Sequence, residues 1–185
     1  EIVAGILFAG LGAAFAVLQW FKWGSHRLRQ VVALLAAATG VVLVYCISQV
    51  YSLETVPAWS TWHTPLRFFI TAFLLGGLAV GAALVVAASV RAKRGHELDA
   101  DGARLVAASV WGTAFGGILA LGLKFVGLPA YIGYLGTQGS AAAQESLRLL
   151  TDTYGAFSAT QTLLIFAGIA LLGYLLYRMW GRDVG

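Results

Sequence analysis

The polar and aromatic side chains that could act on a ligand gather at one end of the apolar segments of this chain. They are Glu1, Glu54, Trp59, Trp62, His63, Arg67 and Asp152. Such a set suits the head group of a quinone, because its oxygens need hydrogen-bond partners and its ring can stack on an aromatic side chain. A carboxylate or an imidazole can take the protons released on oxidation. Interfacial aromatic and charged residues are also ordinary in membrane proteins, so the same residues fit a structural role.

The sequence offers few residues that could bind a haem, a metal ion or an iron–sulfur cluster. His26, His63 and His96 lie between the apolar segments, which does not suit a haem held by two histidines at matched depth. No carboxylate and histidine stand at metal-ligand spacing. Cys46 is the only cysteine, so this chain alone does not supply an iron–sulfur cluster. We therefore expect no haem and no metal bound by this chain.

The composition predicts that the chain is embedded in a lipid bilayer. Hydrophobic residues make up 59% and charged residues 11% of the 185 residues, whereas soluble domains carry about 25% charged residues. Five apolar stretches each offer about 20 residues, enough to cross a bilayer. We expect one all-α transmembrane bundle over 1–185, with two intervening loops at 52–65 and 127–154. Its predicted spans are 2–21, 31–51, 66–90, 105–126 and 155–178.

The distribution of basic residues predicts the orientation of these spans. One side collects most of them, namely Lys22, Arg27, Arg29, Arg91, Lys93, Arg94, Arg104, Arg178 and Arg182. The other side holds Arg67, Lys124 and Arg148. By the positive-inside rule the first side is cytoplasmic, so residue 1 and both loops are expected outside and residue 185 in the cytoplasm. No basic patch is interleaved with aromatic residues on a polar surface, so we expect no nucleic acid partner.

The two loops differ in their expected structure. Pro57 and Pro65 are expected to end the helices on either side of the first loop, since proline lacks an N–H and restricts the preceding residue. The second loop begins with a glycine-rich stretch and is expected to continue into a short interfacial helix. That helix would turn Leu147, Leu149 and Leu150 toward the membrane or a partner.

Small residues four positions apart let helix backbones approach closely. Gly77 and Gly81 have this spacing, as do Gly112 and Gly116. They are expected to serve either packing within the bundle or the seam of a dimer.

The order Y-x3-T-V-P-x-W followed by T-P-x2-F-F-x-T resembles the membrane-anchor subunit of the dimethyl sulfoxide reductase family. The matching positions are Tyr51, Thr55, Val56, Pro57, Trp59, Thr64, Pro65, Phe68, Phe69 and Thr71. The opening EIVAGILFAG looks like the start of the family's third helix, and the stretch from Asp152 to Gly155 resembles the start of its seventh. The resemblance thus covers the whole chain, as a fragment of an eight-helix anchor.

This resemblance implies a heterotrimeric complex of anaerobic respiration in a bacterial or archaeal cytoplasmic membrane. A molybdopterin catalytic subunit and a four-cluster iron–sulfur subunit would sit on the anchor, which oxidises menaquinol near the outer face. Glu1 matches the family's quinol-site glutamate, and His63, Trp62 and Arg67 are further candidates for quinol binding. The candidates for docking the iron–sulfur subunit are Tyr51, Glu54, Thr55, Pro57, Trp59, Thr64 and Pro65.

Two other classes of function remain open from the sequence. A small-solute transporter or channel is one alternative, although a proton-coupled transporter would normally place an acidic residue or lysine inside a span, and no span interior has one. A passive membrane scaffold that holds its partners without a quinone site is the other.

Overall fold

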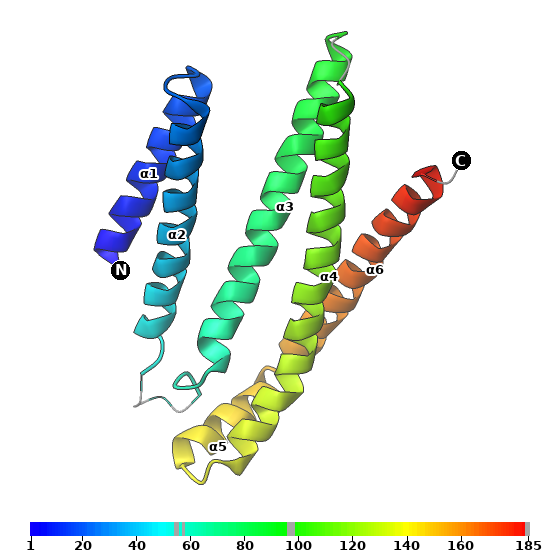
Figure 1. Ribbon diagram of the computed structural model, residues 1–185. Coiled ribbons are helices and arrows are strands. Elements are labelled where there is room, and N and C mark those ends of the chain that lie inside the picture. Colours follow the sequence, from blue (N-terminus) through cyan, green and yellow to red (C-terminus); the bar gives the residue numbers. More distant parts are fainter. Residues whose placement is uncertain (54–55, 57, 96–98, 184–185) are drawn as a thin grey trace. The chain divides into compact units, whose positions relative to one another are not determined.

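The computed structural model describes residues 1–53, 56, 58–95 and 99–183, and over these ranges the chain is helical, without strands. Its long helices are α1 (Ile2–Trp20), α2 (His26–Val50), α3 (His63–Lys93), α4 (Ala100–Thr137) and α6 (Gly155–Asp183). A short helix, α5 (Ala141–Arg148), leads into the π-helical turn η1 (Leu149–Thr153) (Figure 1). The long helices are the five that are long and apolar enough to cross a membrane. The predicted all-α class and the five helices that could span a membrane are therefore confirmed, whereas their assembly into one bundle stays a prediction.

The chain forms two compact parts, Glu1–Phe69 and Ile70–Gly185. In the first part, α1 and α2 form an antiparallel hairpin. Phe8 lies over Gly40, where a Cβ would come within 3.0 Å of the ring, and Leu43 lies 3.8 Å from a Cβ built on Gly5. Because the hairpin is antiparallel, Glu1 and the carboxyl end of α2 lie at the same end of it (Figure 1).

In the second part, α4 packs against both α3 and α6. A Cβ built on Gly116 would lie 2.9 Å from the Phe73 ring of α3, and one on Gly117 would lie 2.7 Å from Leu172 Cδ1 of α6. Glycine thus lets α4 approach both neighbours closely. These contacts support the interpretation that the small residues around Gly116 serve packing within the chain.

A hydrogen bond joins α3 and α4 directly, from the Thr113 hydroxyl to the Gly77 carbonyl oxygen at 3.1 Å. Replacing Thr113 with valine keeps the shape and removes this donor. We expect the free energy of unfolding to fall by about 0.6 kcal/mol, the average found for interhelical hydrogen bonds in membranes. Thr160→Val is the matched control, because the Thr160 hydroxyl donates to Ala156 of its own helix. An equal loss for both variants in denaturant titrations of the solubilised protein would contradict this role.

The fourth helix is longer than the sequence predicted, because it continues through Thr137 and includes residues 127–137 that we expected to form a loop. Pro129 lies inside this helix, where a proline costs about 3 kcal/mol. Tyr131 and Leu135 follow it and are buried, with 7% and 0% of their surface exposed. Burying a large apolar side chain is worth about 1.5–3 kcal/mol, so these two residues offset the proline.

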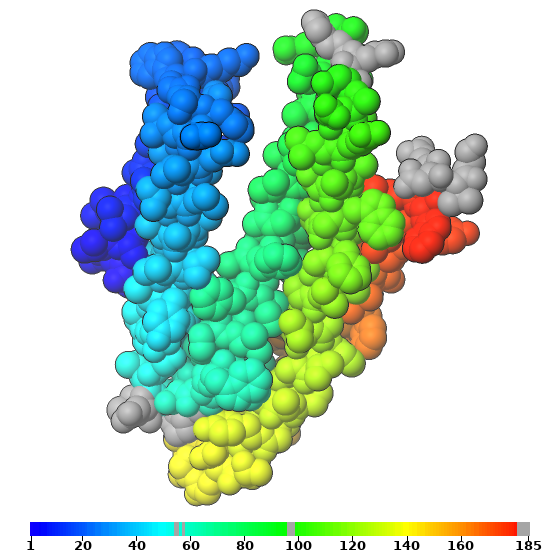
Figure 2. Space-filling model, in the orientation of Figure 1, coloured from blue at the N-terminus to red at the C-terminus, as the bar shows by residue number. Residues whose placement is uncertain are grey.

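The short helix expected after this segment is present as α5, and it packs on the end of α4 (Figure 2). Leu147 was expected to face the membrane or a partner. Leu147 is half-buried, with its Cδ2 4.0 Å from a Cβ built on Gly136 of α4, and whether its remaining surface faces the membrane or a partner stays a prediction. Ser140 caps α5 by accepting a hydrogen bond from the Ala143 N–H at 3.2 Å. Whether α5 lies at a membrane interface stays a prediction.

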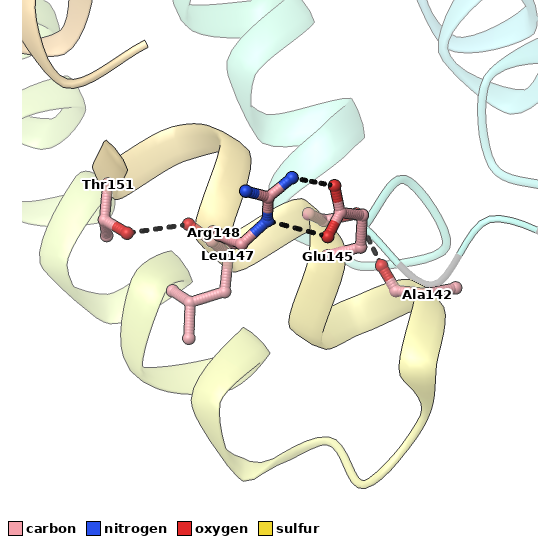
Figure 3. A network of polar contacts seen from close by, with 6 residues as sticks. Ala142, Glu145, Leu147, Arg148 and Thr151 are labelled. Carbon is pink, nitrogen blue, oxygen red and sulfur yellow. Dashed lines mark hydrogen bonds and ion pairs between the residues drawn. The ribbon is translucent and has the colours of Figure 1, made fainter. Parts of the chain in front are cut away.

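A surface ion pair and a side-chain hydrogen bond lie in α5 and at its junction with η1. Arg148 donates two hydrogen bonds to the Glu145 carboxylate, at 2.8 and 2.9 Å, and the Thr151 hydroxyl donates one to the Leu147 carbonyl oxygen at 3.1 Å (Figure 3). The hydrogen bond from Arg148 holds the pKa of Glu145 below its usual value. Exposed pairs of this kind add little stability, so this pair mainly fixes the two side chains.

Helix α3 begins earlier than predicted. It starts at His63, so Thr64 and Pro65 belong to its first turn rather than to the loop. The first N–H groups of a helix have no partner within it, and proline is therefore tolerated there. The expectation that Pro65 ends a helix is wrong, since it stands inside the start of one. Pro57 lies outside the described residues.

Candidate functional site

Three aromatic rings hold the loop between α2 and α3. The Tyr51 ring, just past the end of α2, contacts Trp59 of the loop edge to face, with ring centroids 6.0 Å apart. It also contacts Phe68 of α3, at 5.4 Å. Such ring pairs add about 0.5–1.5 kcal/mol beyond the burial of their area. The cluster therefore ties the loop to both helices that it connects.

Successive backbone turns give this loop its shape. The Trp59 N–H bonds to the Val56 carbonyl oxygen at 2.9 Å, and the Thr61 N–H bonds to the Trp59 carbonyl oxygen at 2.8 Å. The Thr64 hydroxyl donates to the same Trp59 carbonyl oxygen at 2.6 Å. Thr64 was a candidate for partner docking. Here its hydroxyl joins the first turn of α3 to the loop.

Removing that hydroxyl tests how firmly the loop is held. We expect Thr64→Val to cost about 1 kcal/mol of local stability, as for a typical hydrogen bond, and to raise amide exchange between residues 58 and 64. Hydrogen–deuterium exchange measures this directly. Thr39→Val is the control, because the Thr39 hydroxyl donates to carbonyl groups of its own helix. Exchange in the loop that is the same in both variants would show that Thr64 does not hold it.

Trp62 and His63 form a stacked pair at the start of α3. Their ring centroids are 4.0 Å apart and the planes differ by 29°. Trp62 is 66% exposed, whereas His63 is only 5% exposed. Arg67 follows His63 by four residues and therefore lies on the same face of the helix. The outer surface of the Trp62 indole is thus open to a flat ring, with an imidazole behind it and a guanidinium one turn further along.

Glu1 lies just before α1, and its exposed side chain makes no capping hydrogen bond. It belongs to the same compact part as Tyr51, Trp59, Trp62 and His63, at the same end of the α1–α2 hairpin.

Not every residue of the predicted set is in this part. Asp152 belongs to the second part, in η1, where it accepts a hydrogen bond from Thr151 at 3.0 Å. Glu54 and Thr55, like Pro57, are outside the described residues.

Sequence reasoning missed two contacts in this region. It did not predict the contact between the Tyr51 and Phe68 rings, and it did not predict the hydrogen bond from the Thr64 hydroxyl to the Trp59 carbonyl oxygen. The available signal was the presence of an aromatic residue on each side of a proline-containing loop. Within the described ranges, no group of three or more histidine, cysteine, aspartate or glutamate side chains could hold a metal ion.

An open apolar groove of about 630 Å³ lies elsewhere, between α3, α4 and α6 of the second part. Arg178 at its edge donates a hydrogen bond to the Tyr174 hydroxyl at 3.3 Å. The residues described around this groove include no histidine or carboxylate. The loop region, by contrast, stacks the exposed ring of Trp62 on a histidine, so it is the better candidate for quinol chemistry.

Five long apolar helices joined by short segments define a multi-pass membrane protein. The model of one protein family, "DMSO reductase anchor subunit (DmsC)", matches residues 1–184. The chain belongs to this family, and the resemblance seen in the sequence is confirmed.

Curated relatives agree with this assignment. Two are subunits of anaerobic dimethyl sulfoxide reductases from Escherichia coli strain K12: YnfH is 34% identical over 90 residues, and the C subunit is 35% identical over 91 residues. Each match covers 49% of this chain and 31% of the relative. The C subunit of the Haemophilus influenzae enzyme is 22% identical over all 185 residues, which span 58% of that protein. No solved structure matches.

Proposed function

We propose that this chain is part of the membrane anchor of an anaerobic dimethyl sulfoxide reductase complex and oxidises menaquinol. Electrons would pass to a four-cluster iron–sulfur subunit and then to a molybdopterin catalytic subunit. Family membership and the names of the relatives support the anchor role. The observation that supports quinol binding is the exposed Trp62 stacked on the buried His63.

The quinol head group would stack on the open surface of Trp62. Oxidation to the quinone releases two electrons and two protons. His63 and Glu1 would take up the protons released, and Arg67 would supply positive charge to a developing anionic oxygen. The electrons leave for the iron–sulfur subunit docked over the same loop.

The orientation of the chain belongs to the same proposal. The basic residues concentrate at the opposite ends of the helices, which supports an outer location for Glu1 and the α2–α3 loop in the cytoplasmic membrane. Protons taken from menaquinol would then be released outside.

A comparison of two electron donors tests this function in the intact complex. A menaquinol analogue must enter through the anchor, whereas a reduced viologen donates directly to the soluble subunits. We expect a quinone-site inhibitor to abolish turnover with the quinol and to spare turnover with the viologen. If the inhibitor leaves quinol-driven turnover intact, the anchor is a passive scaffold. A chain that purifies without an iron–sulfur partner would favour a transporter or channel instead.

The loop would also form the docking surface for the iron–sulfur subunit. Trp59 is 47% exposed although its ring is held by Tyr51, and a rigid exposed tryptophan is typical of interface hot spots. Tyr51, Thr64 and Pro65 are further docking candidates in this proposal, and the remaining candidates, Glu54, Thr55 and Pro57, lie outside the described residues.

Trp59→Ala is expected to weaken binding of the iron–sulfur subunit about thirtyfold, which corresponds to a hot spot of about 2 kcal/mol. Retention of the soluble subunits on washed membranes measures the effect. Trp180→Ala is the control, because Trp180 is an exposed tryptophan on α6. Equal retention in both variants would remove Trp59 from the interface.

A further inference from the structure

The turn between α1 and α2 exposes three large aromatic side chains in succession. Trp20 is 83% exposed, Phe21 57% and Trp23 61%. The rings of Phe21 and Trp23 stack, with centroids 5.2 Å apart and planes 29° apart. Trp20 is the last residue of α1, and Val17 one turn earlier is also exposed. The aromatic group therefore continues the apolar surface of the helix at the level where the helix ends.

The backbone of this turn fixes a lysine between the aromatic residues. Lys22 has φ of 54° and Gly24 has φ of 72°, so both adopt the left-handed conformation. For a residue other than glycine this costs about 1–2 kcal/mol. The Trp23 N–H bonds back to the Leu18 carbonyl oxygen at 3.0 Å, and Ser25 caps α2 by accepting from the Leu28 N–H at 3.2 Å. These bonds keep the turn tight.

The charge of the turn has no acidic partner on the hairpin. Lys22 and Arg27 are exposed, and Arg29 adds a third permanent positive charge. The sequence has no aspartate or glutamate between Ile2 and Leu53. Glu1 lies at the opposite end of α1. The amino end of α2 adds its own partial positive charge at Ser25 and His26.

We propose that this turn binds the head group of an anionic phospholipid. Tryptophan prefers the boundary between hydrocarbon and head groups, so the aromatic residues would set the depth of the turn. Lys22 and Arg27 would then contact the lipid phosphate, and clusters of basic residues beside membrane helices attract anionic lipids. The continuity of the aromatic surface with the apolar side of α1 favours a lipid over a protein partner.

Photoactivatable lipids test the proposal in the intact complex, reconstituted in nanodiscs. One probe carries a phosphatidylglycerol head group and the other phosphatidylcholine, and mass spectrometry measures the labelling of residues 19–30. The anionic probe is expected to label this segment in clear excess. Lys22→Asn with Arg27→Gln should reduce the excess about twenty-five-fold, since each charge near an anionic surface is worth about fivefold in affinity. Asparagine tolerates the left-handed conformation, so the turn is preserved.

Arg148→Gln is the matched control, because Arg148 is already paired with Glu145. It should leave the labelling of residues 19–30 unchanged. Equal labelling by the two probes in the wild-type complex would overturn the proposal. Labelling that appears only after another subunit is removed would also overturn it and would assign the turn to a protein interface.

Discussion

Replacement of His63 by phenylalanine in the intact complex is expected to lower menaquinol-driven turnover about a hundredfold, the lower range of what a positioned acid–base group contributes. Phenylalanine preserves a flat ring beneath Trp62, which the native imidazole contacts at a centroid distance of 4.0 Å. It removes the ring nitrogens, and with them the ability to exchange a proton and the electrostatic interaction with Arg67. Turnover with reduced viologen should stay at the wild-type level, because that donor bypasses the anchor.

Two companion variants separate proton transfer from stacking. Trp62→Ala removes the exposed ring and should mainly raise the quinol KM. His26→Phe makes the same change as His63→Phe at the other end of the α1–α2 hairpin and should have no effect. If His63→Phe keeps nearly wild-type quinol turnover while Trp62→Ala loses it, His63 only supports the indole. If neither variant matters, the quinol binds elsewhere.

Gly117→Leu is expected to destabilise the second part by about 1–3 kcal/mol, the usual cost of overpacking a well-packed core. Gly117 is buried, and a Cβ there would already lie 2.7 Å from Leu172 Cδ1 and 3.6 Å from Leu74 Cδ1. A leucine side chain there therefore has to push the Leu172 side chain of α6 aside, and it extends into space next to Leu74 of α3. Denaturant-induced unfolding of the solubilised protein measures the loss.

Gly112→Leu is the matched control, since it lies on the same helix and has nothing within 4 Å of a Cβ built there. It should change stability by less than about 0.5 kcal/mol, as is usual at exposed sites. Leucine has a higher helix propensity than glycine, so propensity alone cannot lower the stability of either variant. Equal losses at both positions would therefore contradict a packing role that is specific to Gly117.

Hydropathy and charge were enough to predict five helical spans, because the bilayer demands long apolar segments whatever their contacts. The ends of the helices depend on local contacts that hydropathy does not encode. Helix α2 begins at His26 rather than 31, since Ser25 caps it. Helix α4 runs past Pro129, since Tyr131 and Leu135 are buried beyond it. Glycine and proline signals suggested a loop there, and tertiary packing overrode them.

In the candidate site, too, the sequence predicted which residues are present but not the contacts that they make. The sequence placed aromatic and charged residues around the α2–α3 loop, and the structure keeps Tyr51, Trp59, Trp62 and His63 together in one compact part. Sequence patterns could not predict that His63 is buried while its neighbour Trp62 is exposed, because burial depends on the three-dimensional contacts of each side chain. Nor could they separate Thr64, whose hydroxyl bonds to the loop, from residues that would meet a partner.

The most direct test of the central claim is electron paramagnetic resonance of the iron–sulfur clusters in the anaerobic complex after addition of a menaquinol analogue. If this chain passes electrons from quinol to its partner, the clusters become reduced in the wild-type complex and remain oxidised in the Trp62→Ala and His63→Phe double variant. Reduction by dithionite should be complete in both. Equal reduction by quinol in both complexes, or none in the wild type, would contradict a quinol site at Trp62 and His63.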